Sequence, residues 1–379
     1  MTTMSSKSLT KEQTKERLKE HEHDESICGI GATEMAIMVT GIGFVGAYIV
    51  RDLLAAGEDV VVYGLFGGRP GQSEAFPDIE NAVYLIGEEA WAGVKVVVGD
   101  ICDEDLLGRT VRDNKVTGII HMAGMVAAAS EANIPRAVNV NIQGCIAVFE
   151  TAIRHKVARI VWASSINVFG PRSLSPEGVI HDDSPIDPTS AYGSTKAFVE
   201  QIARRYQVNA GLNAVGLRLG KVYGFGEHVK AGRGGGNMWF NNLLENPARG
   251  RGGNIVPFSE KKLDFQYVED VAQAFLTALR STEGAGDSFL NAGDYRSIKE
   301  AFEFVQACLP EADMTLTEGG EAAGLKPGAQ TNWMFQFDGS RGKTALGLAP
   351  RHTMEDGLIR TINAYRKLDG LPPVADPRG

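Results

Sequence analysis

A tyrosine and a lysine four positions apart, Tyr192 and Lys196, are the side chains of this sequence with the clearest capacity for chemistry. In a helix this spacing puts both side chains on one face. A lysine ammonium beside a phenol favours the phenolate and lowers the phenol pKa from about 10 toward the working pH. Such a pair can take a proton from an alcohol, although a partly buried tyrosine beside a solvated lysine would have the same spacing.

Two other features strengthen the chemical interpretation of this pair. The serines Ser164 and Ser165 end an apolar run at 160–163, and the turn Gly41-Ile42-Gly43-Phe44-Val45-Gly46 follows the first apolar run. Glycines in such a turn allow the backbone to approach a pyrophosphate, and the N-terminus of the next helix faces the phosphates. Together these parts predict a nicotinamide enzyme that transfers a hydride at a carbinol or carbonyl carbon.

Six short apolar runs alternate with segments long enough for crossover helices. The runs are 35–39, 60–63, 94–98, 118–121, 160–163 and 214–219. Most are continuously apolar, as strands buried on both faces are. The pattern predicts an α/β fold with a Rossmann-type doubly wound parallel sheet.

The chain divides into three parts. A charged leader covers 1–34, with a short helix from Thr10; we expect its His21 and His23 to be solvated and predict no metal site. The dinucleotide-binding domain is predicted at 35–220 with about 255–292. A smaller C-terminal substrate-binding lobe is predicted at 221–254 and 293–379, with one short helix near 239–246 and two helical segments after 292.

The composition is that of an ordinary globular protein, with 379 residues, 43% hydrophobic and 22% charged. A net charge of -9 and a pI near 5.4 argue against a nucleic-acid partner, because phosphate binding needs a basic face. No apolar run approaches the ~20 residues of a membrane span. The N-terminus lacks a signal-peptide core and the four cysteines are scattered, so the expected compartment is the cytoplasm.

The second strand ends in Tyr63-Gly64, where an acidic residue would usually bind the adenosine ribose. Gly64 leaves room for a 2'-phosphate, and Arg69 could pair with that phosphate or lie exposed in its loop. The cofactor is therefore NAD or NADP, with a slight lean to NADP. Asp100 could reach the adenine amino group or cap the following helix.

Over 35–366 the ordered motifs resemble the extended short-chain dehydrogenase/reductase family, which contains sugar-nucleotide epimerases and dehydratases. Beside the glycine turn and the Tyr192 segment, the matching segments are His121-Met122-Ala123-Gly124, Asn139 to Gly144, Ser164 to Gly170, Leu217 to Gly224 and Asp264 to Ala272.

The resemblance implies roles for named residues. Ser165 would hydrogen-bond the substrate oxygen, Tyr192 would act as acid or base, Lys196 would lower the phenol pKa and hold the nicotinamide ribose, and Asn141 would order a proton-relay water. The implied cofactor-binding residues are Gly41, Gly43, Phe44, Val45, Gly46, Asp100, Ile101, Met122, Ala123, Gly124, Tyr192, Lys196 and Val222, with Arg69 as above. It also implies a homodimer formed by helices near 138–155 and 191–207.

Departures from the family pattern bear on the substrate. Lys221 stands where the family usually has asparagine, and Leu263 stands where an arginine often grips a nucleotide diphosphate. The residues after Ser165, Ile166 and Asn167, supply no acid for the elimination that a 4,6-dehydratase performs. We therefore expect a small polar hydroxylated substrate, sugar-like or a hydroxy acid, rather than a nucleotide sugar.

Candidate substrate contacts are Asn167, Lys221, Arg233, Asn237 and Trp239. Lys221 and Arg233 would suit a carboxylate or phosphate, although Arg233 could equally be a mobile surface residue in its glycine run. The predicted function is an NAD(P)-dependent oxidoreductase. A nucleotide-sugar epimerase and a non-catalytic NAD(P)-binding regulator are the alternatives, and the intact catalytic set disfavours the regulator.

Overall fold

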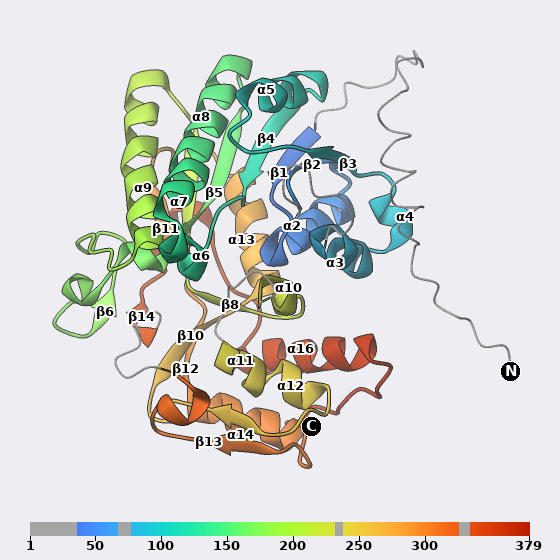
Figure 1. Ribbon diagram of the computed structural model, residues 1–379. Helices are drawn as coiled ribbons and strands as arrows, with labels where there is room; N and C mark the ends of the chain where they lie inside the picture. The colour runs from blue at the N-terminus through green and yellow to red at the C-terminus, as the bar shows by residue number, and fades with distance from the viewer. Residues whose placement is uncertain (1–35, 67–76, 232–237, 326–333) are drawn as a thin grey trace, which may run out of the picture.

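The computed structural model describes residues 36–66, 77–231, 238–325 and 334–379, and a seven-stranded sheet is its largest unit (Figure 1). The strand order is β11-β7-β5-β4-β1-β2-β3, and every neighbouring pair is parallel. The strands are β1 (Ala36–Thr40), β2 (Asp59–Gly64), β3 (Lys95–Val98), β4 (Val116–His121), β5 (Arg159–Ser165), β7 (Ala214–Leu219) and β11 (Ser288–Leu290). The six predicted strands and the doubly wound parallel sheet are confirmed.

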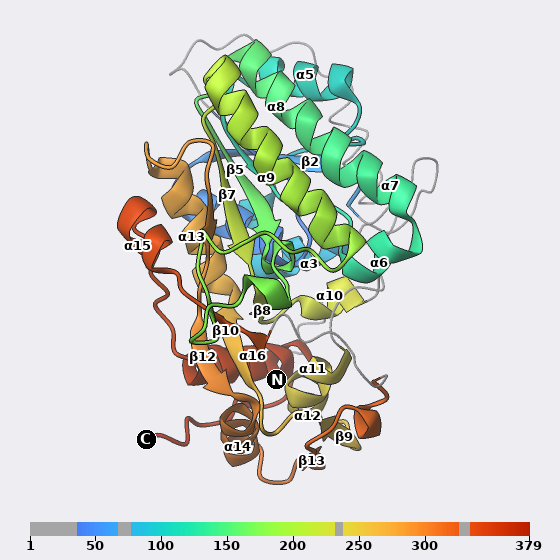
Figure 2. The ribbon, with the colours of Figure 1, turned by 90° about the vertical axis from the view of Figure 1, so that its left-hand side faces the viewer.

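The continuous apolar runs arise because helices cover both faces of the sheet. All five residues of β1 are buried, and its Met38 and Val39 belong to different hydrophobic clusters, one on each face. One face is covered by α2 (Phe44–Ala55), α3 (Pro77–Ile86) and α13 (Val268–Arg280). The other is covered by α5 (Glu104–Asp113), α8 (Gly144–His155) and α9 (Ala191–Ala210), and α9 lies in front of the β5 and β7 strands in Figure 2.

The smaller part of the molecule lies below the carboxyl edge of the large sheet (Figure 1). It contains a three-stranded sheet, β12-β10-β8, and a two-stranded pair, β13-β9; a second short pair joins β14 to β6. The strands are β6 (Val179–Ile180), β8 (Lys221–Tyr223), β9 (Asn254–Val256), β10 (Lys262–Tyr267), β12 (Asp294–Ser297), β13 (Met314–Leu316) and β14 (Gln336–Phe337). The layout differs from the predicted division at one place, because β9 and β10 lie in the smaller part although about 255–292 was predicted to belong to the dinucleotide-binding domain. The two-lobe division itself stays a proposal.

The helices of this part are more numerous than the sequence pattern indicates. They are α10 (Glu227–Ala231), α11 (Met238–Leu243), α12 (Glu245–Ala248), α14 (Ile298–Cys308) and α16 (Met354–Leu368), whereas α15 (Ser340–Leu346) packs beside β11 of the large sheet. The predicted single helix near 239–246 is two short helices, because Pro247 lacks the N–H that would continue α11 through Leu244. Three helices of the described residues, rather than two, follow position 292.

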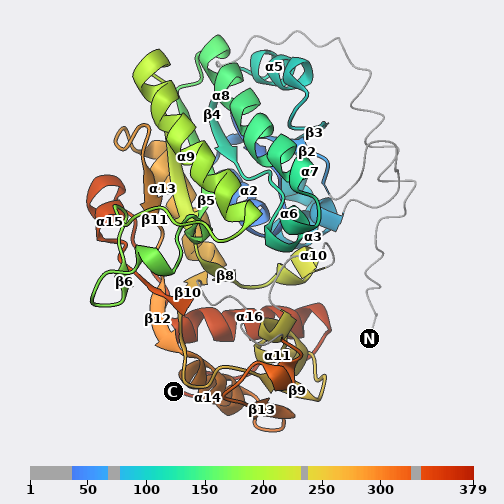
Figure 3. The same ribbon diagram turned by 60° about the vertical axis from the view of Figure 1, so that its left-hand side comes forward.

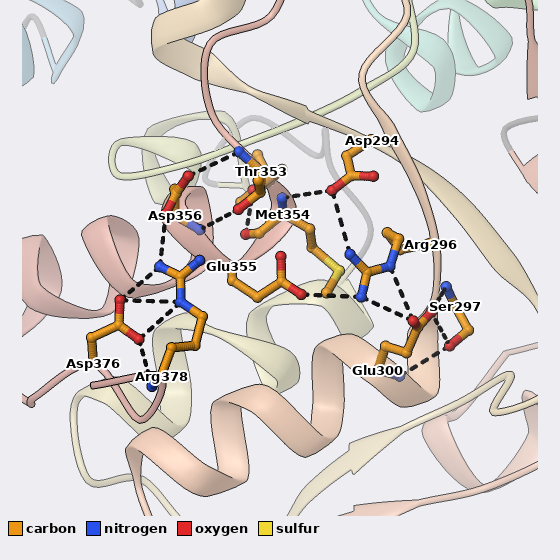
Figure 4. A network of polar contacts seen from close by, with 11 residues as sticks. Asp294, Arg296, Ser297, Glu300, Thr353, Met354, Glu355, Asp356, Asp376 and Arg378 are labelled. Carbon is orange, nitrogen blue, oxygen red and sulfur yellow. Dashed lines mark hydrogen bonds and ion pairs between the residues drawn. The ribbon is translucent and has the colours of Figure 1, made fainter.

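A network of ion pairs joins β12, the start of α14, the start of α16 and the C-terminal segment (Figure 4). The guanidinium of Arg296 lies 2.9 Å from Glu300 and 3.1 Å from Glu355, and that of Arg378 lies 2.7 Å from Asp356. Partly exposed pairs of this kind contribute about 0–1 kcal/mol each. The network therefore orients the C-terminal segment on α16 more than it stabilises the fold.

Within the described ranges, no helix is long and apolar enough to cross a lipid bilayer. The predicted leader, with its short helix and its two histidines, lies outside those ranges.

Candidate active site

The glycine turn between β1 and α2 packs so closely that side chains in it would collide with neighbouring backbone. Gly41 has φ +75°, and a Cβ there would lie 2.9 Å from the Cα of Ala123. A Cβ at Gly46 would collide with the carbonyl oxygen of Gly41. Gly43 precedes the first turn of α2, whose free N–H groups begin at this edge. The turn thus leaves backbone and a helix N-terminus exposed to a phosphate-bearing ligand, as a dinucleotide cofactor requires.

The end of β2 lies next to this turn. A Cβ at Gly64 would lie 3.5 Å from the amide nitrogen of Gly41. Neighbouring Tyr63 donates its hydroxyl to the carbonyl of Asp100 at 2.8 Å, and the Asp100 carboxylate accepts the amide of Cys102 at 3.0 Å. The helix-cap alternative for Asp100 is wrong, because Asp103 caps α5. Arg69 lies outside the described residues.

Asn141 lies in a π-helical turn, Asn139–Gln143, between α7 (Ile134–Val138) and α8. Its amide oxygen accepts the Met125 N–H at 2.7 Å, and its amide nitrogen donates to the Met125 carbonyl at 3.0 Å and to the Thr195 hydroxyl at 3.1 Å. Single π-turns are frequent at functional sites. The side chain therefore ties the loop after β4 to α9, and its role in ordering a relay water stays a prediction.

Lys196 lies where β5 meets α9. Its ammonium donates to the carbonyl of Ala163 at 2.7 Å and lies 5.8 Å from the centre of the Tyr192 ring. A Cβ at Gly124 would lie 3.7 Å from the same ammonium and 3.2 Å from the Asn141 amide oxygen. Burial lowers the pKa of Lys196, while the charges of Cys145 and Glu200 oppose that shift.

Tyr192 belongs to the first turn of α9, which Ser190 caps by accepting the Gly193 amide at 3.0 Å. A Cβ at Gly193 would collide with the carbonyl oxygen of Asn167, so α9 can pack this closely on the turn after β5 only with glycine there. The Ser165 hydroxyl accepts both the amide and the side-chain amide of Asn167 at 3.2 Å.

The environment of Tyr192 corrects one expectation. Burial raises the pKa of Tyr192 to about 12, and the hydrogen bond with Ser165 opposes the shift only in part. The predicted lowering by Lys196 is not seen here, because the ammonium is held by the Ala163 carbonyl and the phenol is desolvated. With this raised pKa the Tyr192 phenol is protonated at neutral pH.

Two of the candidate substrate contacts are corrected. The Lys221 ammonium forms an ion pair with Glu227 and lies 4.2 Å over the Phe240 ring, so its charge is already matched inside the protein. Trp239 is 2% exposed within the hydrophobic core, where it packs on Phe240. Neither side chain is presented to a ligand.

The remaining candidates differ in how they are placed. Asn167 is half-buried and touches Ser165, as a substrate contact would. Ile101 and Val222 are buried, so their role in cofactor binding stays a prediction. Arg233 and Asn237 lie outside the described residues.

His121 is a residue of this site that the sequence indicated only as part of a motif. It ends β4, is buried, and its Nδ1 lies 2.7 Å from the hydroxyl of Thr40 at the end of β1. Burial and then the Lys196 charge lower the pKa of His121 to about 3. The imidazole is therefore neutral and links two strand ends beside the glycine turn. Its position at the end of an apolar run was the available signal.

A comparison with family models matches residues 37–293 to the NAD dependent epimerase/dehydratase family. The chain belongs to this family, whose members are NAD-dependent enzymes, and the predicted resemblance is confirmed.

Particular relatives are similar over most of the chain. UDP-glucose 4-epimerase of Azospirillum brasilense is 26% identical over 89% of this chain and 93% of its own length. The dTDP-glucose 4,6-dehydratase of Streptomyces niveus is 25% identical over 88% and 93%. Among solved structures, UDP-glucose 4-epimerase of Thermotoga maritima with UDP-glucose has a TM-score of 0.70 at 22% identity, covering 88% of this chain and 99% of that chain. At that identity the structural match shows the fold.

Proposed function

We propose that this protein is an NAD(P)-dependent oxidoreductase acting at a carbinol or carbonyl carbon of a small polar hydroxylated substrate, sugar-like or a hydroxy acid. The observation that carries the proposal is the convergence of Ser165, Tyr192 and Lys196 where β5 meets α9. The glycine turn at Gly41, which begins α2, lies at the same sheet edge beside Ala123. This arrangement supplies a proton donor, a cation and a phosphate cradle side by side.

Each side chain has a distinct task in this mechanism. Ser165 holds the substrate oxygen beside Tyr192. In reduction the Tyr192 hydroxyl gives its proton to that oxygen, and in oxidation the Tyr192 phenolate, once it has lost its proton, takes the proton of the substrate hydroxyl. Lys196 offers its ammonium toward the ribose of a bound nicotinamide cofactor. When bound, that cofactor supplies or accepts the hydride. Asn141 holds the loop after β4 against α9 and so keeps the donor in place.

A redox assay over a substrate panel tests the function. Reduction of NAD and of NADP would be followed with sugar acids, hydroxy acids and amino alcohols. We expect turnover with at least one compound and, because no acid ends β2 at Gly64, a modest preference for NADP. The cofactor preference would be contradicted by tighter NAD binding that Arg69→Ala leaves unchanged. Absence of turnover over the whole panel with both cofactors would reject the oxidoreductase and favour the regulator.

A nucleotide-sugar epimerase is the second candidate, and the relative from Azospirillum brasilense favours it. An epimerase differs from a dehydrogenase because it does not release the oxidised intermediate but reduces it again on the opposite face. Two observations count against it. Leu263 is wholly buried in the core where an arginine would grip a diphosphate, and Lys221 is paired with Glu227. A lost bidentate arginine removes hydrogen bonds worth about 1.5–3 kcal/mol each.

Nucleotide binding separates the two candidates. We expect calorimetry with UDP, GDP and dTDP to show no specific heat of binding, because the diphosphate lacks its anchors. NADH serves as the positive control for folded protein. Micromolar affinity for any of the three nucleotides would make the epimerase the better assignment.

We also propose a homodimer whose interface is the outer face of the helices α7, α8 and α9 (Figure 3). Four large apolar side chains on α7 and α9 are exposed to between 39% and 66%: Ile134, Val138, Phe198 and Val208. Exposed apolar groups gathered on neighbouring helices are typical of a protein interface. A second copy placed by a two-fold axis would cover the same face on both partners.

Sedimentation at micromolar concentration tests this assembly. We expect the mass of a dimer for the wild type and of a monomer for Phe198→Glu, since a buried unpaired carboxylate opposes association. The matched control is Leu371→Glu, which changes an exposed apolar residue far from these helices and should remain dimeric. A monomeric wild type would rule the interface out.

A further inference from the structure

A buried cluster of charged side chains lies directly behind the candidate active site. Arg218 on β7 forms two parallel hydrogen bonds of 2.9 Å with both carboxylate oxygens of Glu200 on α9. Its third nitrogen donates to the Asp182 carboxylate at 3.1 Å and to the Asp182 carbonyl at 2.8 Å. Ser164 on β5 donates its hydroxyl to Glu200 at 2.6 Å. All four residues are at most 8% exposed.

The cluster has a fixed relation to the reacting side chains. Tyr192, Lys196 and Glu200 follow one another at intervals of four, and so lie on one face of α9. Consecutive residues of β5 meet that face: the Ala163 carbonyl accepts the Lys196 ammonium, and the Ser164 hydroxyl reaches Glu200. Ser165 follows on the same strand, and its hydroxyl lowers the pKa of the Tyr192 phenol against the effect of burial. A shift of α9 along β5 would therefore change all three contacts together.

Arg218 keeps the Glu200 carboxylate from moving. Ser164 and Arg218 are direct neighbours across the β5–β7 pair, so serine and guanidinium approach the carboxylate from one sheet face. A bidentate arginine–carboxylate pair has a rigid geometry. Buried ion pairs contribute little net stability compared with apolar packing. The contribution of this cluster is therefore a rigid geometry next to the candidate active site, rather than stability.

We propose that Glu200 is a positioning residue: held by Arg218, its carboxylate takes the Ser164 hydrogen bond and sets where α9 lies on β5, and thus how Ser165 faces Tyr192 and Lys196. This inference rests on the function proposed above. It assigns to Glu200 and Ser164 a part in turnover, although neither touches substrate or cofactor.

Ser164→Ala is the principal test, because it removes one link between β5 and α9 and leaves every charge paired. With the substrate found in the panel, we expect kcat to fall about ten-fold, since small misplacements of reacting groups are costly. The KM, the NADH affinity measured by fluorescence and the shape of the pH profile should stay those of the wild type. Glu200→Gln, which keeps the side-chain length, should lower kcat about a hundred-fold.

Thr110→Ala is the matched control. It also removes a buried hydroxyl, which donates to the Leu106 carbonyl within α5 at 2.8 Å, outside the charged cluster, so it should lower the melting temperature and leave kcat unchanged. Wild-type kcat in Ser164→Ala, or an equal loss of kcat in Thr110→Ala, would overturn the positioning role. If the Glu200→Gln variant does not fold, the kcat of Ser164→Ala still tests the positioning role.

The same measurements separate this inference from the function on which it rests. An active Tyr192→Phe variant, or a wild type inactive on the whole panel, rejects the proposed function and the inference with it. An inactive Tyr192→Phe beside a fully active Ser164→Ala rejects the inference alone.

Discussion

Replacing Tyr192 with phenylalanine is expected to lower turnover by about a hundred- to ten-thousand-fold, the range associated with a lost proton donor. The change removes one hydroxyl and keeps the ring, so the packing of α9 on the turn after β5 should persist. NADH affinity, measured by fluorescence, should therefore stay close to that of the wild type. The loss should appear in kcat and in kcat/KM alike, because the proton is transferred in the transition state.

Tyr206→Phe is the matched control for this variant. Tyr206 lies on the same helix and donates its hydroxyl to Glu150 at 2.6 Å, away from the active site. Its loss should leave turnover unchanged. If Tyr192→Phe retains a near-normal rate on the true substrate, the assignment of Tyr192 as the proton donor is wrong.

The strands of the large sheet were predictable because each is a continuous apolar run. Val60 to Val62, for example, are all buried, with Val61 facing one cluster and its neighbours the other. The seventh strand, β11, was not predicted, since three residues carry no pattern of their own. The short strands of the smaller part were not predictable from the sequence for the same reason. Their partners, such as β9 for β13, are remote in sequence.

The proposed catalytic set could be named from the sequence for a different reason, because Ser165, Tyr192 and Lys196 each stand in a motif with its own spacing. The spacing could not show which groups contact each side chain in the folded protein. The lowered phenol pKa assumed a free ammonium near the phenol, whereas the Ala163 carbonyl holds that ammonium and burial dominates at Tyr192. A pKa depends on desolvation, which is a property of the packed structure.

Lys221, a candidate substrate contact, also has surroundings that its sequence motif could not reveal. An isolated lysine in a cleft-facing motif suggests an anion site, but the turn after β8 brings Glu227 against it. Conversely, Glu200 stands in no motif that the sequence singles out. Its contacts depend on tertiary packing: α9 brings it to Ser164, and the register of β5 on β7 places Arg218 beside that serine.

Replacing Lys196 with methionine is expected to separate activity from stability. Methionine keeps the length of the side chain but removes the ammonium from the site. Turnover should fall about a hundred-fold or more, since the cation beside the phenol and the cofactor ribose is lost. NADH affinity should fall as well, which distinguishes this variant from Tyr192→Phe. A variant with wild-type kcat and wild-type NADH affinity would remove Lys196 from the site.

The stability of the same variant should change in the opposite direction, and its pH dependence follows from the burial of Lys196. The pKa of Lys196 is lowered from 10.5 in the folded protein, so between the lowered value and 10.5 the unfolded chain binds more protons than the folded one. The free energy of unfolding of the wild type therefore rises as pH increases through that window. Below the window Lys196 is charged in the folded protein, and burying that charge lowers the free energy of unfolding by its full amount. The methionine variant lacks this cost. We expect its melting temperature to exceed that of the wild type most at neutral pH, and the difference to shrink as pH approaches 10.5. A difference that grows with pH would mean that the ammonium is stabilised rather than penalised by its surroundings.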